Sequence, residues 1–146
     1  MDDLYHPRVL ELAADIAHLG RLADPMGSAD RVSRVCGSFV HVDVRVEAGF
    51  VTAFAIDPKA CALGQASASV LAGNIVGATV AQVVAARDQL RAMLTHGAPP
   101  PAGRFWELRH LEAVRHYPPR HASTLLAFDA AVDAIEQALA KEDAAT

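Results

Sequence analysis

Residues 38–47 follow a period of two, in which valine occupies four consecutive even positions from Val40 to Val46. The odd positions between and after them are polar: His41, Asp43, Arg45 and Glu47. This period of two predicts a strand with one apolar face and one solvent-facing side. Residues 50–56 are a second apolar run, and Ala48-Gly49 provides the two-residue turn between them, because glycine accepts the positive φ that such turns need. The pattern therefore predicts an antiparallel hairpin.

Elsewhere the apolar residues recur every three to four positions, which is the spacing of one helix face. Helices are predicted over residues 4–19, 62–72, 79–95, a short stretch near 106–114, and 123–140. Residues 20–35 are rich in Gly, Pro, Asp and Ser and are predicted to be a loop. Residues 98–103 contain three consecutive prolines and are predicted to be a stiff exposed linker. We therefore expect one domain over residues 1–146, with an α+β fold in which helices cover one face of a small antiparallel sheet.

Residues 60–86 contain no charged side chain, and a stretch of that length could cross a bilayer. Gly73-Asn74, however, is typical of a helix end, and Thr79 is typical of the residue that caps a new helix. Two short helices therefore fit this stretch better than one membrane span.

Composition narrows the classes of function. Hydrophobic residues make up 52% and charged residues 21% of the chain, which excludes a disordered protein. The net charge of −4 argues against a sequence-independent nucleic-acid binder and against attachment to an anionic membrane. The acidic start lacks a secretory signal, and only two cysteines are present, so we expect the reducing cytoplasm.

The two cysteines are the strongest candidates for chemistry. Cys61 follows the second predicted strand and begins a predicted helix, whose N-terminus stabilises a thiolate, and Lys59 is close in sequence. Cys36 precedes the first predicted strand, so a hairpin could bring the two thiols together. Position alone leaves each of them either a reactive thiol or a small buried apolar residue.

Other catalytic patterns are missing from the sequence. There is no G-x-S-x-G motif, no phosphate-binding G-x-x-x-x-G-K-[ST] motif and no G-x-G-x-x-G motif. A structural zinc site needs four ligands, and no C-x-x-C pair is present, so two cysteines do not complete one. His121, immediately before the last predicted helix, is the histidine best placed to join them. We therefore expect a binding protein and not an enzyme.

Four segments together resemble a known family, the NifU N-terminal and IscU-type scaffold proteins of iron–sulfur cluster assembly, and most closely their SufU-like branch. The most specific of them is Ala60-Cys61-Ala62 with Gln65-Ala66-Ser67-Ala68-Ser69, which looks like the family's second ligand motif. Val35-Cys36-Gly37-Ser38 looks like its first ligand motif. The opening residues 4–22 and the segment from Leu111 to Ala127 complete the resemblance, which covers nearly the whole chain.

The resemblance implies a three-stranded antiparallel sheet with helices on one side. It also implies that the chain accepts sulfur from a cysteine desulfurase, holds a nascent [2Fe–2S] cluster, iron or zinc, and passes its cargo to acceptor apo-proteins. The family's ligands are Cys, Asp, Cys and Cys. Cys36 and Cys61 match two of them, whereas Ser38 stands at the Asp position and Ser123 at the third Cys position. His121 is a candidate substitute ligand.

Three functions remain open from the sequence. The first is an iron–sulfur scaffold or carrier with Cys36 and Cys61 as its retained ligands. The second is a zinc-bearing sulfur acceptor that stimulates a desulfurase. The third is a metal-free regulatory or binding module, which the two serine replacements suggest. No nucleic-acid or membrane partner is expected, and the sequence leaves a homo-oligomer open.

Overall fold

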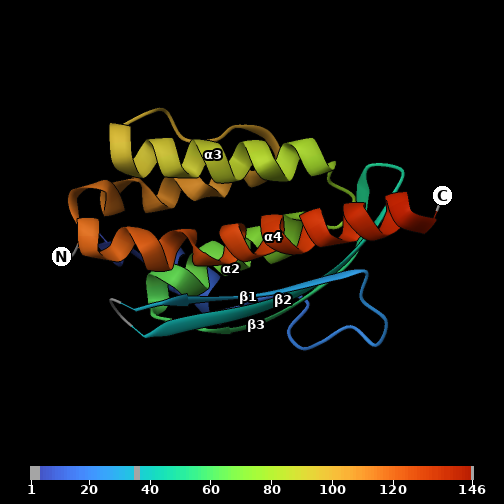
Figure 1. The fold of residues 1–146 in the computed structure, drawn as a ribbon. Helices are drawn as coiled ribbons and strands as arrows, with labels where there is room; N and C mark the ends of the chain where they lie inside the picture. The colour runs from blue at the N-terminus through green and yellow to red at the C-terminus, as the bar shows by residue number, and fades with distance from the viewer. Residues whose placement is uncertain (1–3, 35–36, 146) are drawn as a thin grey trace.

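The computed structural model describes residues 4–34 and 37–145. Its sheet is antiparallel, with β1 (Gly27–Ser33), β2 (Ser38–Glu47) and β3 (Phe50–Lys59) in that order. The helical segments are α1 (Pro7–Ala14), α2 (Ala62–Asn74), α3 (Val80–His96), the 3₁₀ segments η2 (Gly103–His116) and η3 (Pro118–Arg120), and α4 (His121–Ala145). α2 and α4 lie on one face of the sheet, and α3 lies on the far side of α4 (Figure 1). The expected three-stranded α+β architecture is confirmed.

The hairpin predicted from the valine alternation is present. The four valines of β2 are at most 2% exposed, and they form the core surface of the sheet together with Val51, Phe54 and Ile56 of β3. Ala48 and Gly49 both have positive φ, 53° and 82°, as a tight two-residue hairpin turn requires. β3 continues beyond the predicted end at residue 56, as far as Lys59.

Two predictions near the N-terminus are wrong. The segment predicted as a loop over residues 20–35 contains β1, which pairs along its whole length with β2. The helix predicted over residues 4–19 ends at Ala14, since Asp15 leaves helical geometry and His18 has a φ of 59°. Leu19 is then 63% exposed and bridges to Ile56 at the free edge of β3.

The prediction that β2 has one solvent-facing side is wrong at His41 and Asp43, which are 8% and 0% exposed. The cause is the segment of residues 18–26, here called the crossing segment. Its Gly20 N–H donates to the Ile56 carbonyl on β3, and its Met26 N–H donates to the Val44 carbonyl where β1 begins. The segment therefore passes over the face of the sheet that the helices leave open and covers the middle of β2.

The charge-free stretch from residue 60 to 86 forms two helices, as predicted. α2 ends at Asn74, and Thr79 caps α3 through a reciprocal pair of hydrogen bonds with Gln82. Gly97, with a φ of 67°, ends α3. Within the described ranges, no helix is both long enough and apolar enough to cross a membrane.

Candidate functional site

The candidate site is where α2 and α4 begin. Cys61 is the N-cap residue of α2, with extended backbone angles (φ −67°, ψ 171°), because the chain turns there from β3 into the helix. Its thiol is free and half-buried. The Cys61 Sγ lies 3.6 Å from the Ser123 Oγ in the first turn of α4. Two positions 62 residues apart in sequence, both predicted as ligands, are therefore in contact.

Ser123 is held in place by its own hydrogen bond. Ser123 is only 1% exposed, and its hydroxyl donates a hydrogen bond to the Arg120 carbonyl at 3.1 Å. Because that bond uses the single hydroxyl proton, a protonated Cys61 thiol makes the 3.6 Å contact as the donor. The Thr124 hydroxyl also donates to the Arg120 carbonyl, at 2.9 Å. The Ser123 hydroxyl can therefore rotate toward a negatively charged sulfur without leaving that carbonyl unpaired.

Gly64 allows the two helices to approach this closely. A Cβ at this position would lie 3.0 Å from the Ser123 carbonyl oxygen and 2.8 Å from the Ala60 Cβ, both closer than side chains normally pack. The sequence reasoning missed this role. The only signal was a glycine inside a predicted helix, which usually marks close backbone approach when it is not a helix end.

The other candidate residues fall into three situations. Cys36 lies outside the described residues, so its convergence with Cys61 stays a prediction. The pairing of Phe39 with Lys59 places the start of β2 beside the end of β3, at the same end of the sheet as Cys61. Ser38, the first residue of β2, is 3% exposed at that end.

His121 lies two residues before Ser123, but its ring is engaged elsewhere. Its Nε2 is 3.0 Å from the Val114 carbonyl oxygen and 3.3 Å from the Arg115 carbonyl oxygen. Carbonyls only accept hydrogen bonds, so Nε2 carries the hydrogen and is not free to bind a metal in this arrangement. A role for His121 as a ligand stays a prediction and would have to use Nδ1.

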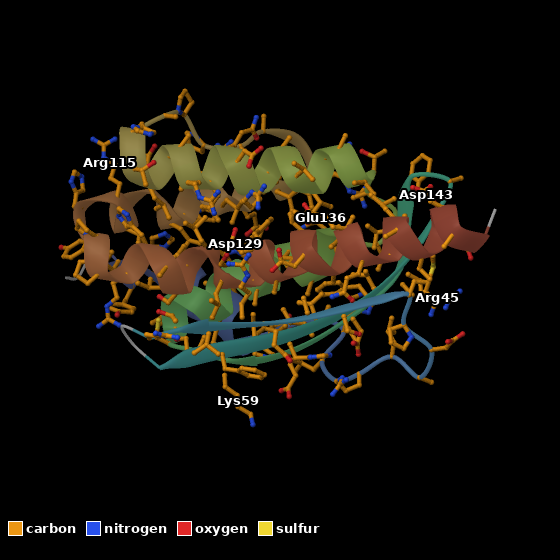
Figure 2. All side chains as sticks on the ribbon, in the orientation of Figure 1. Arg45, Lys59, Arg115, Asp129, Glu136 and Asp143 are labelled. Atoms are coloured by element: carbon orange, nitrogen blue, oxygen red, sulfur yellow. The ribbon has the colours of Figure 1, made fainter. Side chains whose placement is uncertain are left out.

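The described residues alone do not form a metal site. Among them, no group of three or more His, Cys, Asp or Glu side chains is placed to hold a metal ion. Lys59, which the sequence suggested would lie close to the Cys61 thiol, points off the sheet face away from α2 and α4 (Figure 2). The described part of the site therefore consists of one accessible thiol beside one buried hydroxyl.

Comparison with known proteins assigns the chain to a family. Residues 4–143 match the family model described as the NifU-like N terminal domain. The iron–sulfur cluster assembly scaffold protein IscU of Thermotoga maritima is 22% identical over 134 residues, which cover 92% of this chain and 94% of that protein.

Solved structures agree with this assignment. The crystal structure of a nitrogen-fixing NifU-like protein (N-terminal) from Brucella abortus has a TM-score of 0.94 and 48% identity, covering 96% of this chain and 97% of that one. A protein of Fervidobacterium islandicum described as a scaffold for the SUF system has the same fold, with a TM-score of 0.80 at 17% identity over 87% of this chain and 93% of its own. The resemblance seen in the sequence is confirmed: this chain belongs to the NifU-like N-terminal domain family of iron–sulfur cluster assembly scaffolds.

Proposed function

We propose that this chain is a scaffold or carrier, and not an enzyme, that accepts sulfur from a cysteine desulfurase at Cys61 and holds a nascent [2Fe–2S] cluster or iron for acceptor apo-proteins. The observation that carries the proposal is the half-buried Cys61 thiol in contact with Ser123. In the family resemblance these two residues occupy the second and third cysteine-ligand positions. The scarcity of cysteines in the chain suits a reducing cytoplasm, where both thiols stay available.

Sulfur transfer needs only the Cys61 thiolate from this chain. The thiolate attacks the outer sulfur of a persulfide on the desulfurase. A new S–S bond forms on Cys61, the S–S bond of the donor breaks, and the donor cysteine leaves as a thiolate. The neighbouring Ser123 hydroxyl is placed to donate a hydrogen bond to the sulfur while it is negatively charged.

The chain offers fewer thiolate ligands than a stable iron–sulfur site requires. Iron–sulfur clusters are held by four ligands, usually thiolates, and this chain contains only two cysteines. We propose Cys36 and Cys61 as the two thiolates, with Ser38, Ser123 or His121 as weaker candidates for the other positions. A cargo held in this way is labile, which suits a carrier better than a permanent cofactor site.

Anaerobic reconstitution with iron and sulfide tests the proposal. We expect the wild-type chain to develop the visible absorption of an iron–sulfur cluster and to lose it in Cys61→Ser and in Cys36→Ser. Thr52→Ala, an exposed β3 position near the hairpin turn, is the matched control and should bind normally. If the wild-type chain binds no cluster, or both cysteine variants bind as well as it does, the scaffold proposal is wrong.

Thiolates also bind zinc, so a second candidate is a sulfur acceptor that carries zinc. Elemental analysis of protein purified without added metal separates the two functions. Stoichiometric zinc supports the acceptor, whereas iron with acid-labile sulfide supports the scaffold. A chain that binds neither metal but still binds a desulfurase would instead be a metal-free binding module.

A further inference from the structure

The sequence on either side of Cys61, of the start of β2 and of Ser123 carries positive charges and no carboxylates. Residues 31–42, 58–87 and 113–128 contain no Asp or Glu. Arg34 lies in the turn after β1, and Arg120 is the residue whose carbonyl accepts the Ser123 hydrogen bond. We call these two arginines the cationic rim of the site.

Both rim arginines keep their charge available to a partner. Among the described residues neither of them forms a salt bridge, whereas Arg31, three residues before Arg34, makes a double hydrogen bond to Asp133. Arg34 is exposed and Arg120 is half-buried. A guanidinium without a carboxylate partner is suited to forming a bidentate pair with an incoming carboxylate.

The acidic residues gather elsewhere on the molecule. Most of those in the last third of the chain follow α4 away from Ser123, and Figure 2 labels three of them in order toward the C-terminus: Asp129, Glu136 and Asp143. On α4, Asp129 and Asp133 are paired with Arg91 and Arg31. Glu136, Glu142 and Asp143 lie farther along the helix and make its far half acidic, whereas the sequence around Cys61 and Ser123 contains no carboxylate.

We propose that the cationic rim is a docking surface for an acidic polypeptide segment of the sulfur donor, which it steers toward Cys61. This proposal rests on the proposed function and names the chemistry of the partner. A nucleic acid fits less well, because a long polyanion lying across the rim would also meet the acidic half of α4. A short acidic segment gains the attraction of the rim without that repulsion.

The test compares two peptides that react with Cys61 and differ only in the sign of their charge. The chain carries Cys36→Ser so that Cys61 is its single thiol. Each peptide bears an activated disulfide, and one contains five Glu where the other contains five Lys. In low salt we expect the Glu peptide to react about tenfold faster or more, and we expect this preference to fall to near unity at 0.5 M NaCl, where charges are screened within about 4 Å.

Charge reversal identifies the residues responsible. Arg34→Glu combined with Arg120→Glu should slow the Glu peptide and accelerate the Lys peptide, a change of opposite sign that simple loss of structure cannot produce. Lys141→Glu, an exposed position near the far end of α4, is the matched control and should change neither rate by more than about twofold.

Three outcomes would overturn the proposal: equal rates for the two peptides in low salt, an unchanged preference after rim reversal, or stronger inhibition by a single-stranded DNA decamer than by an unreactive Glu peptide. The reaction is measured without iron, sulfide or desulfurase. A chain that fails reconstitution can therefore still show the charge preference, and the two proposals fail separately.

Discussion

Replacing Asp43 by Asn should strongly destabilise the fold, although Asp43 lies outside the candidate site. Its carboxylate is fully buried under the crossing segment and accepts four hydrogen bonds. The donors are Arg21 Nε at 3.0 Å, the Leu22 N–H at 3.0 Å, Ser28 Oγ at 2.6 Å and His41 Nε2 at 2.7 Å. The carboxylate thus joins β1 and β2 to the segment that covers them.

The size of the effect follows from the carboxylate's charge. Burial by itself raises the pKa of the Asp43 carboxyl, but the bonds from Ser28, His41, Arg21 and the Leu22 N–H outweigh burial and lower the pKa from 3.8 to about 2. A difference of that size corresponds to about 2.5 kcal/mol favouring the charged form in the folded state. Asparagine removes the charge and turns an NH₂ group toward one of the donors. We therefore expect a loss of about 2–4 kcal/mol in the free energy of unfolding.

Urea unfolding followed by circular dichroism at pH 6 measures this loss. The matched control is Asp24→Asn, the same chemical change in the same segment, at a side chain that is 89% exposed where it contacts Arg45. The control should cost no more than about 0.5 kcal/mol. If Asp43→Asn costs less than about 1 kcal/mol, or no more than the control, the carboxylate does not hold the crossing segment in place.

The same cluster should make stability depend on pH in two directions. Because the Asp43 pKa is lowered, its stabilisation is complete above about pH 4 and is lost as the pH falls toward 2. Burial and the charge of Arg21 lower the pKa of His41, burial being the larger of the two effects. The hydrogen bonds to Asp30 and Asp43 and the charge of Asp43 raise it by more, so the net pKa shift is upward. The contribution of His41 is therefore complete below about pH 6.5 and is lost as the pH rises through its folded value. His41→Gln should remove this alkaline loss, and an unchanged profile would contradict the account.

Three further expectations concern the helices and the site. Gly64→Ala should destabilise the fold by about 1–3 kcal/mol, because the added Cβ forces α2 away from α4. Gly73→Ala on the same helix, where the added Cβ has nothing within 4 Å, should stabilise the fold by about 0.4–1 kcal/mol. Thermal unfolding compares the two variants, and equal effects would refute the packing argument. Ser123→Cys should raise zinc affinity at least about tenfold in a chelator competition, because it places a thiol beside Cys61, while Ser123→Ala should give no gain. Thr79→Ala should lower the free energy of unfolding by about 1 kcal/mol, and no loss in urea unfolding would show that the cap is dispensable.

The elements that could be predicted from sequence are those whose side chains carry a regular pattern. The valine alternation of β2, the turn at Ala48-Gly49 and the break between α2 and α3 all have such local signals. β1 has none, since Gly27, Ser28 and Asp30 have low strand propensity. β1 forms because the edge of β2 is available to pair with it. It also depends on the missing side chain of Gly27, because a Cβ there would overlap the Ala134 carbonyl oxygen of α4.

The candidate site was predictable to a similar extent. The position of Cys61 at a helix start could be inferred from the residues around it. The assignment of Ser123 came from the family resemblance, and the structure shows their contact. What could not be foreseen is the engagement of the His121 ring by two backbone carbonyls, because that depends on how η2 and η3 fold back on the start of α4. The burial of His41 and Asp43 has the same kind of cause, a distant segment lying over a strand.

The contacts along the outer edge of β3 also affect how this sheet behaves toward other chains. An unpaired edge strand can pair with a strand from another molecule and start aggregation. Here the backbone of β3 is already bonded at Ile56 by His18 and Gly20 and at Val51 by Gly77 and Ala78. Conditions that release the crossing segment, such as acid strong enough to protonate Asp43, would expose the Ile56 part of this edge. We therefore expect low pH to convert the folded protein into aggregates, and not simply into unfolded monomer.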